Sequence, residues 1–169
     1  MANRIAAGLV AGAAGTLALN VAGYLDMLVR GRAASRLPAD VAGKLAEEIG
    51  LPLDFDIEPG SPGSDDDEDD DLDSRLASRQ EALGALLGYA NGLGIGVAYG
   101  MLRLVLPRPP SWLAGAALGS LAMAASDYPA TKLGLTDPHT WSSADWMADV
   151  VPHMAFGVVT ASVFEAIKK

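Results

Sequence analysis

Four apolar stretches separated by polar segments set the pattern of this chain. A helix crosses the hydrocarbon layer of a membrane, ~30 Å thick, with about 20 mostly apolar residues. The four windows with this character cover residues 5–28, 83–106, 112–129 and 148–167. The pattern predicts an all-α, polytopic membrane protein with four transmembrane helices, so that both chain ends lie on the same side of the bilayer.

The third window contains the most informative residue. From Trp112 the uncharged stretch ends at Ser126 after 15 residues, which is too few to cross. We therefore expect this helix to carry Asp127 into the bilayer, or close to it, before Pro129 ends the helix. An ionised group at that depth is costly, so the sequence predicts that Asp127 has a partner.

Glycines recur at intervals of four residues along the predicted helices. Residues this small at this spacing allow helix backbones to approach closely in lipid. They are Gly8 and Gly12 in the first window, Gly84, Gly88, Gly92, Gly96 and Gly100 in the second, and Gly157 in the fourth. These glycines predict a compact, glycine-packed bundle. The spacing leaves open whether the second window contacts a helix of the same chain, a second copy or another protein.

A polar insert, residues 30–82, separates the first two windows. A proline near a helix start, apolar residues at four-residue steps and Gly50 as a stop predict a short amphipathic helix over 38–49, lying on the membrane surface. The linker 58–73 that follows contains seven consecutive acids, residues 65–71. Because such a run repels itself, we expect the linker to be extended and disordered.

The charge distribution narrows the function classes. The net charge is −9, and of 21 acids only Glu165 lies toward the side of the chain ends, so the opposite face is strongly acidic. This charge argues against nucleic acid as a partner, because such binding depends on neutralising phosphates. The chain has no cysteine, which removes disulfides, thiolate metal sites and cysteine nucleophiles. Since no nucleophile lies beside a base and no phosphate-binding loop is present, the sequence predicts neither enzyme activity nor a cofactor.

One group of ionisable residues carries the candidate chemistry. Asp26 ends the first predicted helix, Asp127 ends the third, and Asp149 with His153 begins the fourth, so all four are expected at similar depth on the acidic side. Ionisable groups at membrane depth are candidates for proton relays or ion paths. Three interpretations stay open. His153 fixes helix packing by a hydrogen bond, the group binds a proton or an ion, or it ligates a metal or haem.

Several short motifs resemble known membrane proteins. The chain looks like small four-helix membrane proteins of actinobacteria in residues 12–16, 24–26, 30–32 and 134–138, and in Trp146, Asp149, Pro152 and His153. Its last third is also distantly similar to YagU-like inner-membrane proteins, which share a Gly-Leu-Thr-x-Pro loop followed by a tryptophan, an acid and a histidine. The resemblance implies a four-helix protein of the bacterial inner membrane and an association with acid resistance. It implies no catalytic residue.

Together these patterns favour a non-enzymatic membrane protein. The preferred hypothesis is an accessory or self-associating subunit of a membrane complex, assembled through its glycine-rich helix faces. Its expected partners are the lipid bilayer and other membrane helices, in a homo-oligomer or in a larger complex. The alternative is a small transporter or a proton- or cation-responsive module that uses Asp26, Asp127, Asp149 and His153.

Overall fold

The computed structural model of the chain describes residues 2–54 and 65–168, with side chains in 3–54 and 72–168. All the regular secondary structure in the described part is helical. It contains α1 (Ala2–Arg30), α2 (Leu37–Glu48), α3 (Asp65–Leu102), α4 (Ser111–Lys132) and α5 (Ser143–Ile167), with a short 3-10 helix, η1 (Pro138–Thr140), before α5.

Three helices among the described residues are long and apolar enough to cross a membrane. They are α1 from Asn3, α3 from Leu72, and the whole of α5. The helix α4 is not among them. It has 22 residues and contains Asp127 and Pro129 near its end. The structure therefore supports three of the four predicted spans by length and composition.

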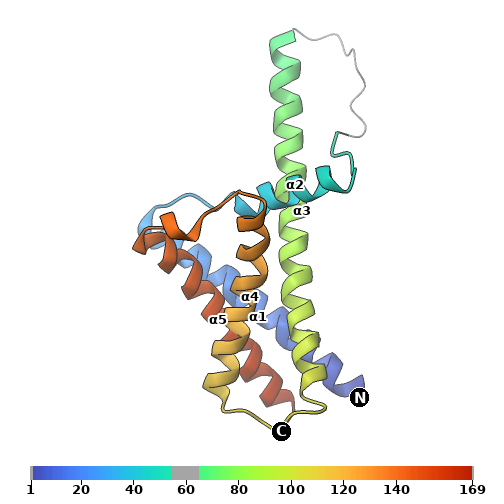
Figure 1. The fold of residues 1–169 in the computed structure, drawn as a ribbon, viewed down its shortest axis with the longest axis vertical. Coiled ribbons are helices and arrows are strands. Elements are labelled where there is room, and N and C mark those ends of the chain that lie inside the picture. Colours follow the sequence, from blue (N-terminus) through green and yellow to red (C-terminus); the bar gives the residue numbers. More distant parts are fainter. Residues whose placement is uncertain (1, 55–64, 169) are drawn as a thin grey trace.

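The four long helices alternate in direction. The start of α1 meets the end of α3, where Arg4 donates to the carbonyl oxygen of Arg103, and the end of α5 lies beside them. We call this the terminal end, since both chain termini lie there (Figure 1). At the other end, the loop end, the Arg30 guanidinium of α1 donates to the Ala144 carbonyl oxygen of α5 at 3.0 Å. Thus α1 and α4 run toward the loop end, and α3 and α5 run back.

The helix α1 lies at the centre of the packing. It contacts both α3 and α5, while α4 packs on α5 and scarcely touches α3. Figure 1 shows α2 lying across α3 near the loop end, and the first turns of α3 projecting beyond the other helices.

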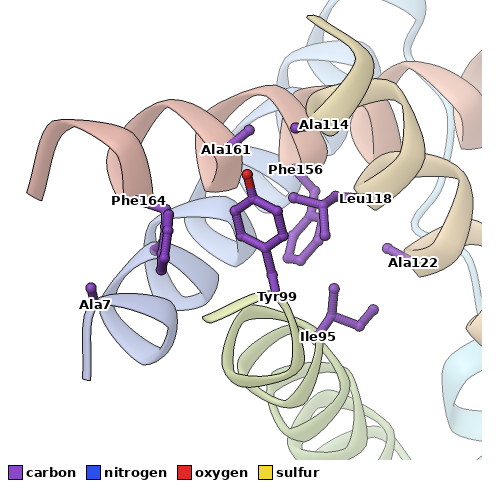
Figure 2. Close-up of a cluster of buried hydrophobic side chains, with 10 residues drawn as sticks. Ala7, Ile95, Tyr99, Ala114, Leu118, Ala122, Phe156, Ala161 and Phe164 are labelled. Atoms are coloured by element: carbon purple, nitrogen blue, oxygen red, sulfur yellow. The ribbon is translucent and has the colours of Figure 1, made fainter. Parts of the chain in front are cut away.

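The core lies between α1, α3, α4 and α5. Figure 2 shows Tyr99 of α3 projecting between Phe164 and Phe156 of α5, with Leu118 of α4 close by. The rings of Tyr99 and Phe164 meet edge to face with centroids 4.9 Å apart, and both phenylalanines are almost fully buried. Buried aromatic rings supply much of the apolar area that holds such small-residue helices together.

Glycines set the distance between the helices. A Cβ atom on Gly96 of α3 would lie 2.3 Å from the carbonyl oxygen of Gly8 of α1. A Cβ atom on Gly157 of α5 would lie 2.0 Å from the carbonyl oxygen of Gly115 of α4. No real side chain fits at these distances, so the α1–α3 and α4–α5 contacts exist in this form only with glycine at these positions.

The start of α3 differs from the predicted disordered linker. The backbone is helical from Asp65, so residues 65–73 are the first turns of α3, whereas residues 58–64 lie outside the described part. The unpaired N–H groups and the positive dipole end of a helix stabilise nearby carboxylates, which favours a helix start among acids.

At its other end, α3 stops before the end of the predicted span, 83–106, because its last helical residue is Leu102. Residues 103–106 form turns, such as Leu104 N–H donating to Met101 O at 2.9 Å.

The prediction that Pro129 ends its helix is wrong. The helix α4 continues through Pro129 to Lys132, and the Leu133 N–H donates to the Pro129 carbonyl oxygen at 2.9 Å. Proline removes its own N–H group and its ring crowds the carbonyl oxygen one turn earlier, but the helix is packed at this point, where Ala130 is fully buried. Asp127 therefore lies inside α4 and not at its last turn.

The last helix begins earlier than the predicted span, 148–167. Ser142 and Asp145 form a capping box, in which Asp145 N–H donates to Ser142 Oγ at 3.2 Å and Ser142 N–H donates to Asp145 Oδ2 at 2.9 Å. The cap adds a turn of helix on the loop-end side of Ala148.

Candidate functional site

The packing of α4 against α5 brings three of the four candidate residues together. The two helices are antiparallel and held close by glycines, so the last turns of α4 lie beside the first turns of α5. Asp127 comes from α4, and Asp149 and His153 come from α5, one turn apart. We call these three residues the carboxyl–histidine cluster.

His153 contacts Asp149, which lies one turn earlier in α5. Its Nδ1 atom lies 3.2 Å from Asp149 Oδ1 and 2.8 Å from the Asp149 carbonyl oxygen. Its other ring nitrogen, Nε2, lies 3.4 Å from Ser126 Oγ of α4. A hydrogen on Nδ1 satisfies the first two contacts and leaves Nε2 free to accept from the serine, or to donate when the ring is charged.

The two carboxyl groups of the cluster line the same cavity and are connected through Ser126 and His153. Ser126 Oγ lies 3.3 Å from Asp127 Oδ1 and 3.4 Å from His153 Nε2, and His153 Nδ1 lies 3.2 Å from Asp149 Oδ1. Asp149 Oδ2 is buried and has no hydrogen-bond partner. Carboxyl, hydroxyl and imidazole groups connected in this way have the donors and acceptors needed to hold or pass a proton.

The structure places Asp26, the fourth candidate, apart from the cluster. Its carboxylate binds Arg30 at 2.6 Å and also pairs with Arg32. These arginines follow Asp26 by four and six residues at the end of α1. Asp26 thus serves a local ion pair, for which its four-residue spacing from Arg30 was a readable signal.

A cavity of about 760 Å³ lies against the cluster and is lined by all of the α-helices. Its apolar walls include Leu19 of α1, Leu87 of α3 and Phe156 of α5, and two asparagines, Asn20 and Asn91, also face it. The helices α3 and α4 have little contact with each other, and both line the cavity. This volume lies within the range of small-molecule sites, ~300–1,000 Å³.

The helix α2 covers one side of this cavity. Its apolar row, Leu37, Val41 and Leu45, lines the cavity, while Ala42 and Ala46 are buried. Gly50 ends the helix with a positive φ of 67°, a conformation that glycine adopts without strain. The apolar row that predicted a surface helix therefore faces the inside of the molecule.

A shallower hollow of about 440 Å³ lies between α2 and the first half of α3. It is lined by residues such as Asp40, Lys44 and Gln80, and none of the candidate site residues takes part. We assign the candidate site to the larger cavity.

Within the described residues, no group of three or more His, Asp or Glu side chains is arranged to hold a metal ion. The metal interpretation of Asp127, Asp149 and His153 therefore gains no support from their geometry. A packing role and a proton site are compatible, because the same hydrogen bonds join α4 to α5.

Two contacts, one in the site and one at the terminal end, were not anticipated from sequence. In the site, Ser126 joins the cluster through His153. Its position next to Asp127 in an otherwise apolar helix is the sequence signal that could have indicated this contact. At the terminal end, Glu165 binds two arginines, with Arg103 at 3.2 Å and Arg108 at 2.6 Å. No spacing rule connects these residues, since Arg103 and Glu165 are 62 positions apart.

No family model matches the chain, and neither a curated protein nor a solved structure does. The resemblance to small actinobacterial and YagU-like membrane proteins therefore stays a prediction.

Proposed function

We propose that this protein is a small multi-pass membrane protein that exchanges protons at the carboxyl–histidine cluster, and so acts as a proton-responsive transport module. The observation that carries the proposal is the network in which Ser126 joins Asp127 to His153 and His153 binds Asp149, on the wall of the large cavity. Two carboxyl groups and an imidazole in one network can pass a proton between them with little movement.

The chain direction supports a fourth crossing. The helix α3 ends at the terminal end and α5 begins at the loop end, so the chain returns between them, and α4 is the helix that makes this return. With 22 residues, α4 is ~33 Å long at ~1.5 Å per residue, enough for a hydrocarbon layer of ~30 Å. We therefore treat α1, α3, α4 and α5 as four spans, in the bacterial inner membrane that the resemblance implies.

This topology puts the cluster near the loop-end surface of the bilayer. Asp127 is five residues from the end of α4, and Asp149 is six residues into α5, so water at the loop end is within reach. The polar and titratable groups at the cluster are Ser126 and Asp127 from α4, and Asp149 and His153 from α5. Across the cavity lie Tyr24 of α1, Arg32 after α1, and Glu81 and Tyr89 of α3. The residues of α2 that line the cavity carry no charge.

Proton movement in reconstituted vesicles tests the proposal. In vesicles loaded with a pH-sensitive dye, the protein should speed the decay of an imposed pH gradient, and Asp127→Asn or His153→Ala should return the decay to that of protein-free vesicles. Each variant has a matched control outside the cluster. Asp26→Asn removes a carboxylate held in a local ion pair, and His139→Ala removes the other histidine, which is exposed.

The proposal fails if Asp127→Asn and His153→Ala leave the decay at the wild-type rate. It also fails if the control variants Asp26→Asn and His139→Ala abolish the decay equally, because the effect would then not belong to the cluster.

The second candidate is the accessory or self-associating subunit. Its argument is weaker in this fold because Gly84, Gly92, Gly96 and Gly100 all contact other parts of the same chain. What favours it is the row of exposed apolar side chains on the outer faces of the helices, including Leu17, Val21, Leu86 and Val158. Mass determination in a mild detergent tests it, since a lone monomer at all concentrations would contradict assembly through these faces.

A further inference from the structure

We propose that the cavity binds a lipophilic organic cation, and that this cation and a proton compete for the carboxyl groups of Asp127 and Asp149. The inference rests on the proposed proton site and adds the class of ligand. It follows from the shape, the polarity and the charge of the cavity walls.

The walls select a mostly apolar ligand. Residues from α1, α2 and α3 present aliphatic side chains to the cavity, among them Leu19, Met27, Val41, Leu45 and Leu87. Burial of apolar surface on such walls contributes ~25 cal/mol per Å². The volume of about 760 Å³ admits a molecule of several rings or a branched hydrocarbon body.

The charges select a cation. Three carboxyl groups face the cavity, from Glu81, Asp127 and Asp149, against one arginine, Arg32. Arg32 is already paired with Asp26, so it gives the cavity little positive charge. A carboxylate facing an apolar cavity is costly unless paired, and a ligand cation supplies the partner that the buried Asp149 Oδ2 atom lacks.

Aromatic side chains add to the same preference. Tyr24 and Tyr89 line the cavity from α1 and α3, and Phe156 lines it from α5. The faces of aromatic rings attract cations, and organic cations are recognised in this way in many proteins. An anion of equal size meets neither the carboxyl groups nor the rings favourably.

The exchange is balanced in charge and protons. A protonated carboxyl group of Asp127 or Asp149 releases its proton when the cation binds, and takes a proton back when the cation leaves. Binding is therefore weaker in acid, because protons and the cation compete for the same carboxyl groups. His153 lies beside both groups and adds repulsion to the cation when it is charged.

Glycines of α3 give a matched pair of variants. Gly88 lines the cavity and Gly94 does not, and no atom lies within 4 Å of a Cβ built on either residue. Gly88→Leu therefore fills the cavity without a clash, while Gly94→Leu adds the same side chain outside it. The pair keeps the test valid even if Asp149→Asn fails to fold.

The probes are tetraphenylphosphonium and its anionic isostere, tetraphenylborate, measured by equilibrium dialysis against the purified protein in detergent. Saturable binding of the cation is expected, about tenfold weaker at about pH 5 than at about pH 8, with proton release in weak buffer. Gly88→Leu and Asp149→Asn should weaken it about tenfold or more, and Gly94→Leu should leave it unchanged. Tetraphenylborate should show only the partition seen with empty micelles.

The inference is overturned if tetraphenylborate binds as well as the cation, or if Gly88→Leu binds the cation like wild type. These results are separable from the proposed function. Proton movement in vesicles with no saturable cation binding would reject the ligand and keep the proton site. Cation binding without proton release, in a protein that moves no protons, would reject the proton site instead.

Discussion

Glu165 is bound by two arginines that differ in exposure. The side chains of Glu165 and Arg103 are each 10% exposed, whereas that of Arg108 is 55% exposed. Arg103 also donates to the Leu106 carbonyl oxygen at 2.9 Å, which holds the turn after α3. A buried ion pair that loses one member leaves an uncompensated charge, whereas an exposed pair contributes little.

We therefore expect Glu165→Gln to be far more damaging than Arg108→Gln. Both changes remove the Arg108–Glu165 pair, but only the first leaves buried Arg103 without a counter-ion. The expected loss is about 3–5 kcal/mol for Glu165→Gln, against about 1 kcal/mol or less for Arg108→Gln. Chemical unfolding in detergent measures both, and equal losses would show that the buried Arg103–Glu165 pair contributes nothing of its own.

At the residue scale, the structure brings together only some of the residues that the sequence grouped. Asp127, Asp149 and His153 stand out as charges in apolar windows, and Ser126 and His153 connect them in the structure. Sequence reasoning grouped Asp26 with them, although Arg30 lies one turn away and binds it. The pairing of Arg103 with Glu165 depends on how distant helices pack, which no local spacing contains.

At the scale of the helix, one glycine ladder serves several partners. Along α3, Gly84 packs on α2, Gly92 packs on Thr16 and Phe156, and Gly96 with Gly100 packs on α1, while Gly88 faces the cavity. The spacing of four predicted a single close-packed face. It did not predict its partners, because α3 has 38 residues and at ~1.5 Å per residue is ~57 Å long, so one face meets different elements along its length.

Replacing each of two nearby glycines with alanine distinguishes the cost of a packing clash from the helix propensity of alanine. Gly96→Ala places a Cβ atom 2.3 Å from the Gly8 carbonyl oxygen, so it must push α1 and α3 apart, at an expected cost of about 1–3 kcal/mol. Gly94→Ala meets no atom within 4 Å and should be neutral or slightly stabilising, because alanine favours helix. Thermal unfolding of the two variants in the same detergent checks this. Equal melting temperatures would contradict the close α1–α3 contact.

Helix boundaries were less predictable than the helices themselves. The acids 65–73 are helical because they begin α3, and Pro129 lies within α4 at a packed position, next to the fully buried Ala130. In both cases the helix dipole or tertiary packing outweighs the local sequence signal, which is a run of like charge in one case and a proline in the other.

At the scale of the whole molecule, the position of the carboxyl–histidine cluster depends on the path of the chain. The contacts of Arg4 with Arg103 and of Arg30 with Ala144 fix opposite ends of the bundle, and they make α4 the return between α3 and α5. This return carries Asp127 to the end of the bundle where α5 begins and where Asp149 lies. The small residues of α4 contact α5 closely, and its cavity-facing turns include Ser126 and Asp127.

The most direct test of the account is therefore whether α4 crosses the membrane. The chain has no cysteine, so Ser111→Cys at the first residue of α4 and Thr140→Cys after the helix each give a single labelling site, and both positions are exposed. In sealed membrane vesicles of known orientation, a membrane-impermeant maleimide should reach the two cysteines from opposite sides, with Lys168→Cys labelled from the same side as Ser111→Cys. Labelling of Ser111→Cys and Thr140→Cys from the same side would contradict the four-span topology and, with it, the position of the carboxyl–histidine cluster in the membrane.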